Sequence, residues 1–313
     1  MPYPNVPANT EPPTELQDHV VSTIGALLSQ YAPCPRDLTV AVVITEDFAA
    51  AVEDAWRISG VDFGLFDSTR PGGTVHGKSI SLNDDRTEWR TIIDSHWWCA
   101  DTTSAERRIS LLAHELFHPR LERLRIEAGS VEHLAGKVDT PAKGARWSVR
   151  NALDEFRCDL AANSVLGALF TVETDQGRRP LPIGLLGLKD GTSYLGAVAD
   201  VFDEILPEWK HVLSARQSVD PARTSLIARK TGGLLTALGH AEAEARSLGM
   251  PGVFAIPELA DHALAALLRV PWVQICEAYD HHQGWDDIHL KDSAIADVGQ
   301  QALLNLWQNL RIL

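Results

Sequence analysis

The spacing of hydrophobic residues changes near residue 103. Before that point, one apolar β-branched run is typical of a buried strand, and short apolar groups between glycines indicate a hairpin or meander. The meander ends in GKSISLN, where Ile80 and Leu82 share one face and Ser79 and Ser81 share the other. The predicted elements are helices over 15–31 and 47–59, a strand over 38–45 and the meander over 61–83.

After residue 103, apolar residues recur every three or four positions, which predicts helices. Pro207, Gly232–Gly233 and Gly239 are positions where these helices could kink or divide. The sequence therefore predicts an α+β fold, with a small sheet in the first half and a mainly helical second half. The predicted helices cover about 104–118, 147–169, 193–216, 221–247, 257–268, 271–280 and 292–310.

The chain has 313 residues, enough for one large domain or two modest ones. Five prolines within residues 1–13 predict a disordered arm. The stretch 177–191 is rich in Gly and Pro and is the best candidate for a domain boundary. We expect an α+β domain over 14–176 and a helical region over 192–313, and the two could equally pack as one unit.

Asp and Glu outnumber Lys and Arg by 42 to 28, which gives a formal net charge of −14. Nucleic acids and anionic membranes bind clustered cations, so this balance argues against both as partners. No stretch approaches the ~20 apolar residues of a membrane span. The early apolar run 20–28 follows acidic residues, whereas a secretory signal begins with positive charge. We therefore expect a cytoplasmic protein.

The four cysteines are far apart and form no C-x-x-C, which argues against a disulfide framework and a cysteine-only zinc site. The sequence also contains neither G-x-G-x-x-G nor G-x-x-x-x-G-K-[ST]. A nucleotide-dependent enzyme therefore has little support.

The segment Thr103–Arg120 carries the clearest chemical signal. Thr103 and Glu106 have the spacing of a capping box, and Pro119 is expected to end or bend the helix that follows. Apolar residues then recur at helical spacing between these two points. They are Ile109, Leu112, Ala113, Leu116 and Phe117.

Within this helix lies an H-E-x-x-H motif formed by His114, Glu115 and His118. Residues four apart share one helix face, so both imidazoles can bind one zinc ion, and Glu115 can reach a water on that metal. The alternative is a solvated helix that happens to carry two histidines. The pattern arises by chance in about one chain in thirty of this composition, so we predict a metal site.

A catalytic zinc ion needs a third protein ligand and leaves one position to water. Glu155 is the best candidate, on the next convincing helix, and Asp159 shares its face. Asp159 could then accept the free ring N–H of a metal-bound histidine. Asp154 is the main rival as ligand and Cys158 a weaker one, and Glu155 could also be an ordinary surface carboxylate.

At these residues the chain resembles the gluzincin metallopeptidases, whose third ligand is a glutamate in a later E-x-x-x-D helix. It is most similar to the small intracellular ImmA/IrrE-type branch, over about residues 15–170. The matching segments are Ile80–Asn83, Arg107–His118 and Glu155–Ala162. Phe117 stands where the branch usually has glycine, and the insertion 84–102, with three tryptophans, is long.

The resemblance implies a zincin-like domain over 14–176 that binds one Zn²⁺ per chain and hydrolyses a specific protein or peptide. Glu115 would take a proton from zinc-bound water and pass it to the leaving amine. An oxyanion donor is also needed, and Tyr279, His281 and His282 are the most suggestive candidates, followed by Tyr194 and His211.

The segment around Tyr279 has two other interpretations. It could be a polar loop between helices, or His281 and His282 could join Asp286 or His289 in a second metal site.

Two further functions remain open for the whole chain. The two-His, one-carboxylate set could hold iron or another divalent ion for non-hydrolytic peptide tailoring. The chain could also be a catalytically silent zincin-fold protein that regulates or binds a partner.

Overall fold

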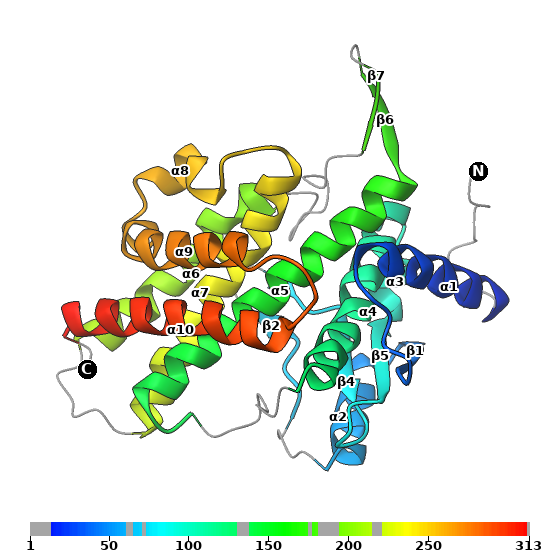
Figure 1. The fold of residues 1–313 in the computed structure, drawn as a ribbon, viewed down its shortest axis with the longest axis horizontal. Coiled ribbons are helices and arrows are strands. Elements are labelled where there is room, and N and C mark those ends of the chain that lie inside the picture. The colour runs from blue at the N-terminus through cyan, green and yellow to red at the C-terminus, as the bar shows by residue number, and fades with distance from the viewer. Residues whose placement is uncertain are drawn as a thin grey trace. The chain divides into compact units, whose positions relative to one another are not determined.

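The computed structural model describes residues 14–60, 65–70, 73–129, 138–174, 177–180, 194–214 and 221–311, and its fold is mixed α+β (Figure 1). None of the helices in these ranges is long and apolar enough to cross a membrane. The helices are α1 Thr14–Tyr31, α2 Phe48–Ile58, α3 Ser95–Cys99, α4 Ala105–Glu127, α5 Pro141–Leu169, α6 Tyr194–Ser214, α7 Pro221–Ser247, α8 Pro257–Ala260, α9 Ala263–His281 and α10 Ile288–Asn309. The strands are β1 Thr39–Thr45, β2 Thr69–Arg70, β3 Gly73–Thr74, β4 Gly77–Ser81, β5 Glu88–Asp94, β6 Thr171–Thr174 and β7 Gly177–Pro180.

The chain divides into two compact units, which differ from the division expected from sequence. Unit 1 comprises residues 1–70, 74–124 and 161–181, and unit 2 comprises residues 71–73, 125–160 and 182–313. The first four residues of the expected linker form strand β7, which pairs antiparallel with β6. The rest of that linker and the expected disordered arm 1–13 lie outside the described residues.

Unit 1 contains a three-stranded sheet in the order β1-β5-β4. The central strand β5 pairs parallel with β1 and antiparallel with β4. Thr91, Ile92 and Ile93 of this strand are completely buried. β5 lies in the stretch 84–102 that was expected to be an insertion, so the strand that joins the other two was not predicted.

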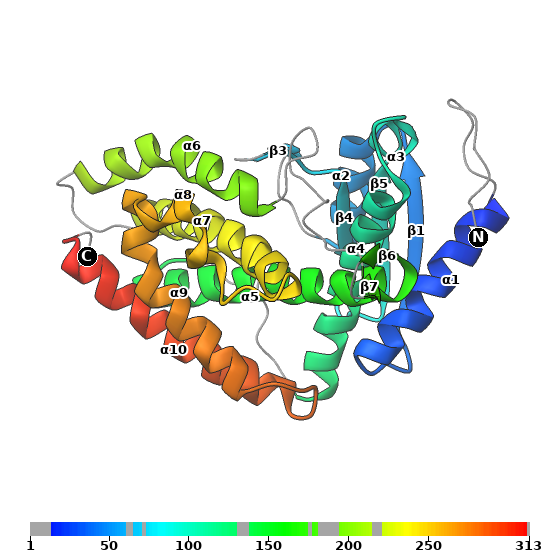
Figure 2. The same ribbon diagram turned by 90° about the horizontal axis from the view of Figure 1, so that it is seen from above.

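Helix α2 covers one face of this sheet, and Figure 2 shows it beside β4 and β5. Its residues Phe48, Val52 and Ala55 are buried in one cluster with Ile80 of β4 and Ile92 of β5. The predicted alternation along β4 is confirmed, because Ile80 points toward α2 and Ser79, on the other face, hydrogen-bonds to α4.

Unit 2 is a helical assembly around residues 141–160 of α5. Helices α6 and α7 pair with each other, as do α9 and α10 (Figures 1 and 2). Pro207 and Gly239 leave α6 and α7 undivided, and α9 runs through Pro271, so the predicted break at 268–271 was wrong. The largest buried side chains of this core are Phe156, Phe202, Trp209, Trp272 and Trp307.

A buried network of ion pairs crosses the core of unit 2. Arg125 at the end of α4 donates from Nε to Asp292 of α10 at 2.6 Å and pairs through its other nitrogens with Asp154 of α5. Arg157 of α5 donates to the second oxygen of Asp292. An unpaired buried charge lowers the stability of the fold by several kcal/mol. Each of these four side chains therefore needs its charged partner in the folded state.

We expect Asp292→Asn to lower the free energy of unfolding by about 3–5 kcal/mol at neutral pH, because Arg125 and Arg157 both lose a buried counter-ion. Burial raises the pKa of Asp292, but both guanidinium groups outweigh it and lower that pKa overall. The stabilisation is therefore complete above the unfolded-state pKa of about 3.9 and disappears as the pH falls through the lower folded-state value. Urea unfolding from pH 7 to 3 checks this.

The matched control is Asp297→Asn, since Asp297 pairs with Arg146 at an exposed position of the same helix. It should change stability by less than about 1 kcal/mol. An Asp292→Asn protein as stable as wild type at pH 7 would contradict the prediction.

Candidate metal centre

Helix α4 begins as predicted, but a different residue caps it. The side-chain oxygen of Ser104 accepts a hydrogen bond from the backbone N–H of Arg107 at 3.3 Å, whereas Thr103 is buried. The expected capping box at Thr103 and Glu106 was therefore wrong by one position. The predicted apolar stripe is confirmed, because its five members are all buried: Ile109, Leu112, Ala113, Leu116 and Phe117.

Pro119 lies inside α4, which continues to Glu127, so the helix does not end at this residue, one of the two outcomes predicted for it. Proline has no N–H, so the carbonyl oxygen of Glu115 cannot receive the usual helical hydrogen bond from four residues ahead. Ser79 of β4 supplies the donor instead, with its Oγ 2.7 Å from the Glu115 carbonyl oxygen. The helix therefore continues because the sheet replaces its missing bond.

The same helix is also tied to α1. Arg120 is buried and donates to the carbonyl oxygens of Gly25 and Ala32 and to the hydroxyl of Ser29. Burial lowers the pKa of its guanidinium, which nevertheless stays charged because arginine titrates far above neutral pH. These bonds hold the turn that follows the H-E-x-x-H motif.

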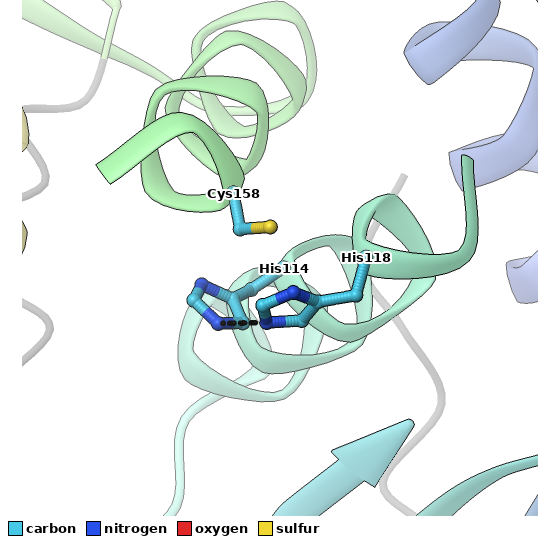
Figure 3. Close-up of side chains that lie close together, drawn as sticks. All are labelled: His114, His118 and Cys158. Carbon is cyan, nitrogen blue, oxygen red and sulfur yellow. Dashed lines mark hydrogen bonds between the residues drawn. The ribbon is translucent and has the colours of Figure 1, made fainter. Parts of the chain in front are cut away.

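The two motif histidines converge on one point (Figure 3). Their Nε2 atoms are 3.1 Å apart, and the rings meet edge to face with centroids 4.9 Å apart. Two nitrogens bound to one tetrahedral zinc ion at about 2.0–2.1 Å would be about 3.3–3.4 Å apart. The spacing of His114 and His118 therefore fits two ligands of a single metal ion.

Glu115 lies between these histidines in sequence and is buried against β4. A Cβ atom at Gly77 would come within 2.8 Å of its Cγ and 3.1 Å of its Oε1. Gly77 is the first residue of β4, an end strand of the three-stranded sheet. Glycine at this position therefore lets the Glu115 side chain lie directly against the strand backbone.

Cys158 of α5 joins the two histidines. One ligand atom from each of His114, His118 and Cys158 lies within 4.8 Å of the others, in the part of the chain that the structure describes (Figure 3). A cysteine thiolate is a common zinc ligand. Glu155 is not a member of this group, so its role as third ligand stays a prediction.

The other predicted carboxylates have definite partners inside unit 2. Asp154, the rival candidate for third ligand, is bound to Arg125. Asp159 accepts a hydrogen bond from a histidine ring, as predicted of it, but the ring is that of His240 on α7, at 2.6 Å from Nδ1. His240 was not predicted, because it lies 81 positions from Asp159 and no sequence motif connects the two.

The candidate oxyanion donors lie near the end of α9 in unit 2. Tyr279 packs on the ring of Phe156, with centroids 5.0 Å apart, and the Arg157 guanidinium lies 5.4 Å from its centroid. His281 is the exposed last residue of α9, and His282 follows it as the C-cap. Neither histidine belongs to the ligand group described above.

The remaining candidates give no further support. His211 is exposed on α6, and the side chain of Tyr194 lies outside the described part of the chain. Asp286 and His289, proposed for a second metal site, do not belong to the ligand group either.

Comparisons with protein-family models, with curated proteins and with solved structures found no match to this chain.

We expect Ser79→Ala to cost about 1–3 kcal/mol of unfolding free energy, because it leaves the buried Glu115 carbonyl without a donor. The loss should be smaller in a Pro119→Ala background, where residue 119 regains an N–H that can bond this carbonyl. A double-mutant cycle by urea unfolding measures the coupling.

Ser81→Ala is the matched control, since Ser81 donates to Asn83 and not to the helix. It should show no coupling to Pro119→Ala. Equal losses for Ser79→Ala with and without the proline would show that the hydroxyl does not replace the missing helical bond.

Proposed function

We propose that this chain is a zinc-dependent metallopeptidase that cleaves a specific protein or peptide. The observation that carries the proposal is the 3.1 Å separation of the His114 and His118 Nε2 atoms, which suits two ligands of one ion. Glu115, which lies between these histidines in the sequence and is buried, adds the base that hydrolysis requires.

The architecture around the motif supports a zincin-like assignment of unit 1. Its sheet ends in a strand, β4, that runs antiparallel to its neighbour, and α4 lies on one face of that sheet. This arrangement agrees with the resemblance of residues 80–83 and 107–118 to gluzincins of the ImmA/IrrE type.

A bound zinc ion would supply a Lewis acid that polarises a carbonyl group and lowers the pKa of water. Glu115 accepts a proton from the attacking water and delivers it to the leaving amine nitrogen. An extended peptide can add to an end strand such as β4 through main-chain hydrogen bonds. Because Glu115 lies against Gly77, that placement brings the peptide backbone to the base.

We expect Glu115→Gln to abolish peptide hydrolysis, by at least about 10²-fold, and to retain zinc, because glutamine keeps the shape but cannot accept the proton. The zinc-loaded chain is incubated with a mixed peptide library in oxygen-18 water, and mass spectrometry detects new carboxyl termini that carry the heavy oxygen.

His114→Ala is the companion variant and should lose both zinc and cleavage. Products without the heavy oxygen would favour non-hydrolytic tailoring instead. Zinc binding without any turnover by wild type would favour a silent regulatory protein.

The third ligand can be identified by replacing zinc with Co²⁺. We expect Glu155→Ala to weaken metal binding by about 10-fold or more, and Cys158→Ala to leave it nearly unchanged. If Cys158 is the ligand, wild type will instead show a thiolate-to-cobalt charge-transfer band in the near ultraviolet, and Cys158→Ala will remove it.

A further inference from the structure

Strand β1 lies at one end of the three-stranded sheet of unit 1, and among the described strands it pairs only with β5. Its sequence, TVAVVIT, contains no charged residue, no Pro and no Gly, and its register with β5 is continuous, without a bulge. None of its seven residues is buried, whereas three residues of β5 are completely buried. Charges, prolines and bulges are the usual protection of an end strand against pairing with another chain. β1 has none of them, so it is suited to accept a further strand.

The edge of β1 that faces away from β5 presents the backbone groups of alternate residues. The N–H of Thr39 donates to the carbonyl oxygen of Thr87, at 2.8 Å, on the β5 side. Backbone groups of successive residues in a strand point to opposite sides, so those of Val40, Val42 and Ile44 point away from β5. An added strand must align its own outward groups with these three residues, which limits the possible registers.

The charges that flank β1 suit a second copy of the same strand. Arg36 is exposed in the turn before β1, and Glu46 is exposed directly after the strand. Two identical strands related by a two-fold axis run antiparallel, so the start of each lies beside the end of the other. Arg36 of each copy is thereby brought to Glu46 of the other, which gives two pairs of opposite charge.

A two-fold axis at Ala41 satisfies both the backbone and the charges. Val40 of each copy then lies opposite Val42 of the other, so that outward backbone groups meet and two aliphatic side chains pair on one face. Arg36 lies opposite Glu46 in the same register. An axis between two residues is excluded, because it would place outward groups opposite inward ones.

An axis one residue further on, at Val42, also aligns the outward groups but brings like charges together. Asp37 of each copy would lie opposite Asp47 of the other, and like charges directly opposite each other are destabilising. Asp37 is bound to Arg123, and Asp47 accepts from the N–H of Ala50 at the start of α2, so neither carboxylate can turn away without losing its own contact. The charges therefore select the register centred on Ala41.

We propose that β1 pairs antiparallel with β1 of a second copy of this chain, about a two-fold axis at Ala41. The two three-stranded sheets then form one continuous six-stranded sheet, in the order β4-β5-β1-β1-β5-β4. The contact is isologous, since both copies use the same surface. This pairing needs neither a metal ion nor the proposed hydrolase activity.

Sedimentation equilibrium of the full chain over a range of concentrations measures the dimer affinity. We expect wild type to form dimers, and Arg36→Glu and Glu46→Arg each to weaken them by about 10-fold, because each change replaces two attractions by two repulsions. The double variant should restore the affinity, since opposite charges meet again. Lys78→Glu is the matched control, at an exposed position of β4 at the other end of the sheet, and should change nothing.

A cross-link tests the register. Opposed residues that do not share backbone hydrogen bonds have Cα atoms about 4.5 Å apart, within the range of a disulfide. In a background where the exposed Cys34 is replaced by Ala, Ala41→Cys should give disulfide-linked dimers with diamide as oxidant. Thr39→Cys is equally exposed and should not, because its two copies lie four positions, or about 13 Å, apart along the strand.

Three results would overturn the inference. They are a wild-type chain that stays monomeric at every concentration, a dimer whose affinity does not respond to the charge changes, and cross-linking of Thr39→Cys in place of Ala41→Cys. Each of them leaves the metal site and the hydrolase proposal as they stand, because those depend on α4 and not on β1.

Discussion

The absence of an N–H group at Pro119 constrains the whole candidate centre. It frees the carbonyl oxygen of Glu115, which Ser79 then binds from the sheet. The residue with the predicted catalytic role is therefore fixed through its own backbone, and Gly77 leaves room for its side chain beside the same strand. The carbonyl oxygen left free by Pro119 thus links α4 to β4 through Ser79, and the same strand contacts the Glu115 side chain at Gly77.

Helix α5 is fixed in a comparable way by charge. Asp154 and Arg157 are bound into the buried network with Arg125 and Asp292, so the helix cannot rotate without separating buried ions. Glu155 is the next residue after Asp154 and points instead toward His240. The ion pairs therefore set the direction in which the predicted ligand faces.

The sequence predicts most of the helices and the H-E-x-x-H geometry, because both depend on local periodicity. It fails where a distant partner decides the outcome. Pro119 lies inside a helix whose freed carbonyl oxygen is bound by Ser79 of the sheet, and β5 is a strand although it lies in the stretch 84–102 that was taken for an insertion. His240 lies 81 positions from Asp159, so no motif could have paired them.

The buried ion pairs also have a consequence for how a new chain matures. Asp292 lies 167 positions after Arg125 and 135 after Arg157, so both arginines leave the ribosome long before their shared counter-ion exists. Until α10 is made, α5 must keep these charges in contact with water. The helix that carries Glu155 can therefore settle only late in synthesis, which delays any metal capture that depends on it until most of the chain has been translated.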